Sequence, residues 1–241
     1  KRGKVFSKWA KLIMTAARNG GSDTDMNLAL RYAIERAKAD NMPKDSIERA
    51  VKKGAGELDG AAMEEVIYEG YAPGGVAILV NCLTDNRNRT VSSVRMTFNK
   101  NGGNMGESGS VSYMFDQLGK IEYPLAIADE DTVMEAAIEA GADDVEHDEE
   151  SEDQWDEYEP VHSIWTQRDD LGEVASNLEA KFGEAKSVNL VWKAQNLIDN
   201  PELAAQVVRI MDALDDVDDV SNVYHNFDMT EEAMATLEDD E

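Results

Sequence analysis

The sequence predicts an α+β protein: an N-terminal helical bundle followed by two α/β domains of ferredoxin-like type, the third domain inserted into the second. Apolar residues recur at helical spacing up to about residue 54, the pattern then becomes extended, and one β-α-β-β-α-β succession fills residues 119–192. We therefore expect a first domain over residues 1–58, a discontinuous second domain over 59–117 and 193–241, and an inserted domain over 118–192.

Three short helices are predicted in the first domain. Residues 4–18 carry apolar side chains on one stripe at about 100° per residue. This helix is expected to end near Gly20, because glycine tolerates the positive φ of a helix end. Asp25 or Asn27 can cap a second helix, and Pro43 suits the first turn of a third helix.

Extended segments follow after residue 60. Residues 66–71 and the apolar run 76–83 predict two strands. A helix that carries Val91, Val94 and Phe98 on one side is expected next. Apolar and polar side chains alternate over residues 110–115, which predicts one more half-buried strand.

The inserted domain is predicted to have the ferredoxin-like succession of elements. Its two helices are expected after Asp129 and Asp170. Its four strands are expected over residues 120–124, 144–147, 157–166 and 187–192. An acidic loop lies within it, because residues 143–159 include eleven carboxylates. Carboxylates suit hard cations, but the glycine and terminal glutamate of an EF-hand loop are missing, so a solvated loop is expected.

Two elements after the insertion are expected to return to the second domain. Residues 201–214 are amphipathic, and residues 220–227 have an extended pattern. The second of these would complete the sheet that begins at residue 64.

Composition and charge narrow the function classes. The chain has no apolar run long enough to cross a membrane and no apolar signal core, so a cytoplasmic protein without a membrane partner is expected. The single cysteine, Cys82, excludes an internal disulfide framework and suits a reducing compartment. Because the chain opens on Lys1 and not on Met, we expect further residues to precede it.

The charge is distributed unevenly. The net charge of the 241 residues is −27, yet residues 1–60 hold 13 Lys and Arg against 8 Asp and Glu, a balance of +5. The remainder carries −32. The Debye length is about 8 Å at physiological salt, so a basic face held apart from the acidic remainder can meet phosphate. The asymmetry favours a nucleic-acid partner, although a solvated helix face is the alternative.

Cations of the N-terminal helices and one polar loop are therefore predicted to contact nucleic-acid backbone. The loop, residues 84–90, carries Arg87, Asn88 and Arg89 where a strand meets a helix, and such loops often carry function. The alternative is local: Asn86 or Asn88 caps the helix and Asp85 pairs with an arginine. The full predicted set is Lys1, Arg2, Lys4, Lys8, Lys11, Arg18, Arg31, Arg36, Lys38, Lys44, Arg49, Lys52, Lys53, Arg87, Asn88 and Arg89.

No catalytic, metal or cofactor site is predicted. The glycine-rich stretch 101–110 lacks the residue orders of a phosphate-binding or dinucleotide-binding loop and follows a helix, so a mobile or tightly turned connection is expected. The histidines at 147, 162 and 225 are widely spaced in sequence. We expect a non-enzymatic protein with no cofactor and no small-molecule substrate, acting as a monomer.

Several strings, in order along nearly the whole chain, resemble the YebC family, also called PmpR. The resemblance implies an N-terminal helical bundle and two α/β domains, the third inserted in the second. It also points to the basic N-terminal helices and to the loop Asp85–Arg89 as functional positions. The strings are Lys1–Phe6, Ala16–Arg18, Asn41–Ala50, Tyr68–Ala77, Leu83–Thr90, Gly109–Val111 and Asn222–Phe227.

The resemblance implies two competing functions. Members are commonly described as DNA-binding transcriptional regulators. Others resemble ribosome-associated translation factors that act at stalls on proline runs, and a mitochondrial relative activates translation of cytochrome oxidase subunits. A protein-interaction adaptor is the third hypothesis, and duplex DNA or ribosomal RNA is the expected partner under the first two.

Overall fold

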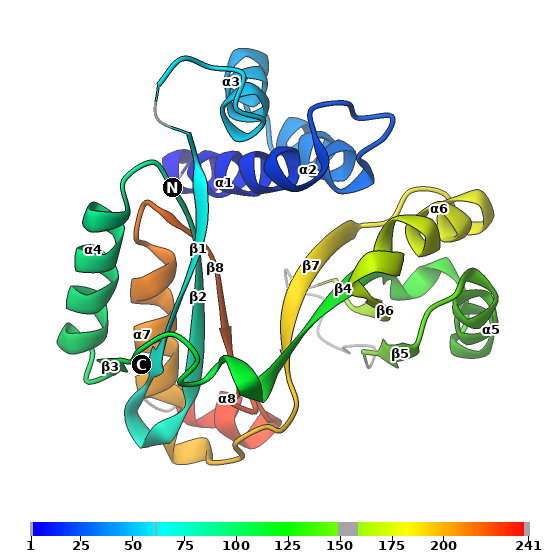
Figure 1. Cartoon of the computed structure of the whole chain (residues 1–241). Helices are drawn as coiled ribbons and strands as arrows, with labels where there is room; N and C mark the ends of the chain where they lie inside the picture. The colour runs from blue at the N-terminus through cyan, green and yellow to red at the C-terminus, as the bar shows by residue number, and fades with distance from the viewer. Residues whose placement is uncertain (1, 61, 149–158, 239–241) are drawn as a thin grey trace. The chain divides into compact units, whose positions relative to one another are not determined.

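The computed structural model describes residues 2–60, 62–148 and 159–238 (Figure 1). By its internal contacts the chain divides into two compact units. The first contains Lys1–Thr15, Gly56–Asp116 and Trp192–Glu241, and the second contains Ala16–Ala55 and Gln117–Val191. The predicted α+β class, with a helical N-terminal region and two four-stranded sheets, is confirmed. The division into three domains stays a prediction.

The N-terminal region contains three helices, α1 (Arg2–Gly20), α2 (Leu28–Ala39) and α3 (Lys44–Gly54). Of the two candidate caps for the second helix, Asn27 is the one that caps it. Its side-chain oxygen accepts a hydrogen bond from the Leu30 N–H at 3.1 Å, and its amide group donates to the carbonyls of Ala16 and Gly21. One buried side chain therefore fixes both the start of α2 and the turn before it.

The sheet of the first unit has the strand order β3-β1-β2-β8. Its central strand β2 is buried along its whole length, and β8 pairs with it antiparallel. This pairing joins segments on either side of residues 118–192 in sequence, as the predicted insertion requires. The strands are β1 (Glu64–Tyr71), β2 (Ala77–Thr84), β3 (Asn104–Met105) and β8 (Val220–His225).

Helices α4 (Arg87–Lys100) and α7 (Ala204–Asp215) lie side by side against this sheet (Figure 1). The core between them includes Ile78, Phe98 and Ile210, which are fully buried. The C-terminal helix α8 (Glu231–Glu238) adds Ala233 to the same core and was not predicted. Burial of these apolar side chains fixes which face of α4 points inward.

The strand predicted over residues 110–115 is wrong in part. Residues Ser112–Met114 form a turn of 3₁₀-helix, and strand β4 begins only at Phe115. The reason is that Glu69 accepts hydrogen bonds from the N–H groups of Val111 and Ser112, at 3.0 and 2.6 Å, so these donors are not available to a sheet ladder. The apolar alternation reflects burial of Val111 and Phe115 beside an exposed Tyr113.

The sheet of the second unit has the order β5-β6-β4-β7, which is the ferredoxin-like arrangement that the sequence predicted. Helices α5 (Glu130–Ala140) and α6 (Leu171–Phe182) pack on it around Ile121, Ile164 and Leu178. The strands are β4 (Phe115–Pro124), β5 (Asp144–His147), β6 (Val161–Gln167) and β7 (Ser187–Ala194).

The acidic loop predicted within residues 143–159 lies mostly outside the described residues, as does the start of the strand predicted over 157–166. Within the described part of the chain, no helix combines the length and the apolar character that a membrane crossing needs.

Candidate nucleic-acid interface

Three lysines of α1 were predicted to bind phosphate. Two of them, Lys4 and Lys11, contact the segment just before β8. The Nζ atom of Lys4 lies 3.1 Å from Oδ1 of Asp216, and Nζ of Lys11 donates to the carbonyl of Val217 at 3.2 Å. Lys8 is exposed and has no ion pair among the described residues. The basic stripe of α1 is therefore partly occupied by the protein's own acceptors.

The arginines of α2 serve mainly to hold this helix against the second unit's ferredoxin-like part. Nη2 of Arg31 lies 2.6 Å from Oε1 of Glu179 on α6, and the hydroxyl of Tyr32 also donates to this carboxylate. Burial, together with the hydrogen bond to Glu179, raises the pKa of Tyr32 to about 12. Nε of Arg36 donates to the carbonyl of Lys186 at 3.2 Å. Both arginines therefore already have partners within the second unit, and their contact with nucleic acid stays a prediction.

Other cations of the N-terminal region are also paired. Nζ of Lys38 lies 3.0 Å from Glu35, within α2. Nζ of Lys44 lies 3.8 Å from Glu48, one turn along α3, and both side chains are exposed. Such exposed pairs are weak and can exchange partners with a phosphate. Arg18 is exposed near the end of α1 and has an interaction within the protein. Lys1 and the side chain of Arg2 lie outside the described residues.

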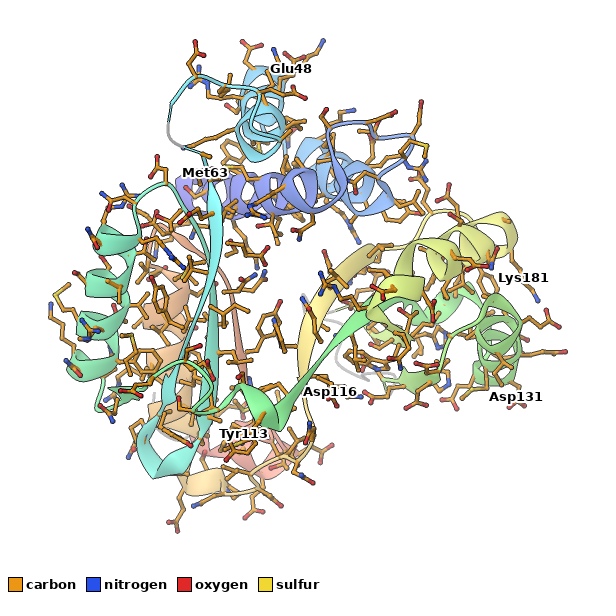
Figure 2. The ribbon with its side chains drawn as sticks, in the orientation of Figure 1. Glu48, Met63, Tyr113, Asp116, Asp131 and Lys181 are labelled. Carbon is orange, nitrogen blue, oxygen red and sulfur yellow. The ribbon has the colours of Figure 1, made fainter. Side chains whose placement is uncertain are left out.

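Besides Lys8 on α1, the N-terminal cations that remain available lie on helix α3. Arg49, Lys52 and Lys53 are exposed, and none has an ion pair among the described residues. At 100° per residue the three positions fall within about 100° of the helix circumference, so they share one face. Figure 2 shows the side chains of α3 extending from the helix, with Glu48 labelled among them. We call these three residues the α3 cations.

An acidic residue and the helix dipole both act near this face. Asp45 lies one turn before Arg49, in the first turn of α3, where the helix dipole favours a carboxylate. Lys52 and Lys53 lie in the last turn, where the dipole favours cations. The dipole therefore accounts for their position along the helix, but it does not account for Arg49 or for the absence of carboxylate partners.

The loop that joins β2 to α4 is occupied by its own hydrogen bonds. Nη2 of Arg89 lies 3.0 Å from Asp85 and 2.8 Å from Asp219, and Thr90 donates to Asp219 at 2.7 Å. Asn86 caps α4 by accepting from the Arg89 N–H at 3.1 Å. The local interpretation of this loop, with an Asn cap and an Asp–Arg pair, is therefore the one that the geometry supports.

The electrostatics of this loop follow from the same contacts. Burial alone would raise the pKa of Asp219, but the hydrogen bonds from Arg89 and Thr90 outweigh burial and lower it. Asp219 therefore stays ionised and neutralises Arg89. Nε of Arg87 lies 3.4 Å from Glu64. Of the three predicted loop residues, only Asn88 has a side chain with neither an ion pair nor a hydrogen bond among the described residues.

The glycine-rich connection holds a carboxylate of the protein itself. The buried side chain of Glu69 accepts from the N–H groups of Gly109, Val111 and Ser112 at 2.6 to 3.0 Å. Burial would raise the pKa of Glu69, but these three backbone donors lower it overall. The amides that could face a phosphate are therefore already used, and of the two connections that the sequence allowed, mobile or tightly turned, these hydrogen bonds favour the tightly turned one.

Two histidines that are distant in sequence meet in the second unit. The Nδ1 atoms of His147 and His162 lie 2.6 Å apart. Nε2 of His162 lies 3.0 Å from the carbonyls of Leu125 and Ala128, so this nitrogen carries a hydrogen. Among the described residues no group of three or more His, Cys, Asp or Glu side chains is placed to hold a metal ion. The pairing of β5 with β6 brings the two rings together, and sequence spacing alone gave no sign of it.

One cationic stretch was missed in the sequence. Between Asn86 and Gly106 the chain has four cations and no Asp or Glu, although 50 acidic residues occur in the whole chain. Two of the four, Arg95 and Lys100 on α4, were not among the predicted contacts. Counting carboxylates in a sliding window, and not only cations in the N-terminal region, would have found this stretch.

The chain is similar to known proteins over nearly its full length. A family described as "TACO1/YebC protein N-terminal domain" matches residues 1–57, and one described as "TACO1/YebC second and third domain" matches residues 63–227. A protein of Maricaulis maris named "Probable transcriptional regulatory protein" is 48% identical over 98% of this chain and 92% of its own length. A crystal structure of a conserved hypothetical protein from Aquifex aeolicus matches with a TM-score of 0.78 at 48% identity, over 94% of this chain and 90% of that one.

Proposed function

Because this chain belongs to the TACO1/YebC family, we propose that it is a non-enzymatic regulator of gene expression that binds nucleic acid through the α3 cations. The name of the Maricaulis maris relative, a probable transcriptional regulatory protein, supports a role in regulation. The observation that carries the proposal is the exposure of Arg49, Lys52 and Lys53 on one helix face without ion pairs among the described residues.

The chemistry of this face favours backbone contacts over base reading. Arg and Lys bind phosphate, and such contacts position a protein without reading sequence. Base reading in a major groove usually needs Asn, Gln or Arg side chains arranged for paired hydrogen bonds. Helix α3 offers one exposed arginine, Arg49, and neither Asn nor Gln. Sequence-independent contact with the sugar–phosphate backbone is therefore the mode that this helix supports.

Duplex DNA is the first candidate partner, and the relative's name favours it. Each phosphate neutralised on B-DNA contributes a slope of about −0.9 in log affinity against log salt. Three cations would contribute about −2.7 in all. This contribution is small beside that of a dense DNA-binding surface, so binding is expected to be weak and to depend only moderately on salt.

A ribosome-associated translation factor is the second candidate, and the charge favours it. The net charge is −27, and Lys4, Arg31 and Arg89 are already paired with carboxylates. Repulsion from the acidic surface weakens binding to an open duplex. A shaped RNA site can accept one small basic face and leave acidic surfaces in solvent, because RNA is recognised largely by shape and backbone.

Co-sedimentation with ribosomes and gel shift on a duplex DNA, each from 50 to 200 mM salt, separate the two candidates. A shift on DNA without ribosomal association supports the DNA-binding regulator, and the reverse supports the translation factor. In either case the variant R49Q/K52Q/K53Q should bind more weakly and with a shallower salt dependence. The control variant R168Q/K181Q/R209Q removes three exposed cations elsewhere and should bind as the wild-type chain does. A wild-type chain that binds neither partner would refute the proposed function.

A further inference from the structure

Helix α4 carries a second face that lacks carboxylates. The positions of Asn88, Ser92, Arg95, Met96 and Asn99 fall within about 100° of its circumference at 100° per residue. Asn88, Ser92 and Asn99 are polar and uncharged. All five side chains are exposed. Lys100 lies at the edge of the same face. We call these six residues the α4 face.

The opposite side of α4 is fixed by the core, so the exposed side is not free to turn inward. Val94 and Phe98 are fully buried against the sheet of the first unit. Figure 2 shows side chains extending from α4 on the side away from β1. The face is therefore held rigidly outward by packing on its other side.

Among the described residues, the carboxylates that form ion pairs with α4 do so in its first turn. Arg87 is paired with Glu64, and Arg89 is paired with Asp85 and Asp219. Farther along the helix, neither Arg95 nor Lys100 has an ion pair among the described residues. In a chain of net charge −27, two uncompensated cations in a stretch without acidic residues form a local positive surface.

The mixture of side chains indicates which nucleic acid fits this surface. From Asn88 to Lys100 the helix is about 18 Å long, a distance along which B-DNA carries about ten phosphate charges. An RNA duplex of this length carries at least as many, so two cations meet few phosphates of either nucleic acid, and the uncharged polar side chains decide between them. Asn88, Ser92 and Asn99 can each both donate and accept hydrogen bonds, as a ribose 2′-hydroxyl does. The 2′-hydroxyls and phosphates that line the shallow minor groove of an RNA helix therefore match the face better than DNA does.

We propose that the α4 face binds the ribose–phosphate backbone of RNA. This proposal rests on the proposed function. It adds a second site, on α4, and specifies RNA as the nucleic acid that this site binds. Arg95 and Lys100 contact phosphates, the three polar side chains contact 2′-hydroxyls, and the thioether of Met96, 52% exposed, packs against ribose. Because α4 and α3 belong to different units, the protein has two separate backbone contacts.

Binding of 20-bp RNA and DNA duplexes of equivalent sequence, from 50 to 200 mM salt, tests the proposal. The wild-type chain should bind the RNA duplex more tightly than the DNA duplex. For RNA binding, R95Q/K100Q should lower the magnitude of the slope of log affinity against log salt by about 1.8. N88A/S92A/N99A should reduce the preference for RNA without changing the slope. The charge-matched control R168Q/K181Q should change neither quantity. Equal binding of both duplexes by the wild-type chain, or an unchanged slope in R95Q/K100Q, would overturn the proposal.

A footprint on the wild-type chain avoids any effect of substitution on folding. The rate of Met96 oxidation by hydrogen peroxide should fall severalfold in the presence of saturating RNA duplex. Met234 has a similar exposure of 55% and serves as the internal control, with an unchanged rate. Equal oxidation rates for Met96 with and without RNA would contradict RNA binding by the α4 face. They would not contradict the proposed function, which weaker binding by R49Q/K52Q/K53Q tests separately.

Discussion

The Nζ atom of Lys4 lies 3.1 Å from Oδ1 of Asp216. These residues are 212 positions apart in sequence, and the pair joins the start of α1 to the end of α7 within one compact unit. A lysine that the charge distribution assigned to nucleic acid therefore already faces a carboxylate of the same chain. The uncompensated basic surface of the N-terminal helices is smaller than their charge predicts.

This pairing predicts unequal effects of two lysine substitutions on nucleic-acid binding. Lys52→Gln should reduce the salt slope on duplex DNA by about 0.9, because it removes one available phosphate contact. Lys4→Gln should change the slope by less, because Asp216 competes for its ammonium group. Fluorescence polarisation across a salt series measures both slopes. Equal reductions would mean that the ion pair opens on binding and that α1 belongs to the interface.

Arg31 is predicted to act on stability and not on binding. Its guanidinium and Glu179 are both largely shielded from solvent, with side-chain exposures of 27% and 29%. Arg31→Gln leaves the carboxylate without its charged partner, so the free energy of unfolding should fall by about 1–3 kcal/mol. Denaturant titration checks this loss. The salt slope of nucleic-acid binding should stay at the wild-type value. A reduced slope would mean that Arg31 contacts phosphate.

Glu69 is predicted to stabilise the connection between β3 and β4. Its carboxylate accepts three backbone hydrogen bonds, so Glu69→Gln should lower the free energy of unfolding by about 1.5–3 kcal/mol. Glu107→Gln, an exposed substitution in the same loop, should change it little. Urea titration of the two variants beside the wild-type chain gives the comparison, and similar losses in both would contradict a special role for Glu69.

The pH dependence of this effect has a definite sign. The pKa of Glu69 is lower in the folded chain than its ordinary value of 4.5. Its contribution is therefore fully present above pH 4.5 and is lost as the pH falls through the lowered folded pKa. The stability difference between wild type and Glu69→Gln should shrink over that acid range. A difference that stays constant down to pH 3 would show that charge on Glu69 is not its source.

Cys82 is predicted to be unreactive while the chain is folded. It is completely buried in β2, and burial raises the pKa of its thiol to about 12. Since the thiolate is the reactive form, a thiol reagent such as DTNB at pH 8 should label Cys82 only at the rate of unfolding. Labelling should become immediate in denaturant. Rapid labelling without denaturant would contradict the burial of this strand.

The sequence predicted those parts of the fold that depend on local patterns. The helix that starts after Asp129 and the inward positions of Val94 and Phe98 follow from short-range spacing, and the structure has each of them. The strand predicted over residues 110–115 failed because its backbone donors are taken by Glu69, some 40 residues away. Periodicity reports which side chains are buried, and it does not report which acceptor satisfies a backbone N–H.

The candidate site was less predictable for a related reason. Counting charges located the basic region, but the pairing of Lys4 with Asp216 and of Arg31 with Glu179 depends on tertiary contacts between distant segments. Only the folded chain distinguishes a compensated cation from an available one. Asn88 was the one residue of the α4 face among the predicted contacts, because the prediction followed cations in the N-terminal region and one loop and did not use the absence of carboxylates between Asn86 and Gly106.

The most direct test of the account compares the salt dependence of duplex DNA binding between the wild-type chain and R49Q/K52Q/K53Q. The account predicts that the triple substitution lowers the magnitude of the log–log slope by about 2.7, whereas R168Q/K181Q/R209Q leaves it unchanged. If both triple variants keep the wild-type slope, the α3 cations do not contact phosphate and the central claim is wrong.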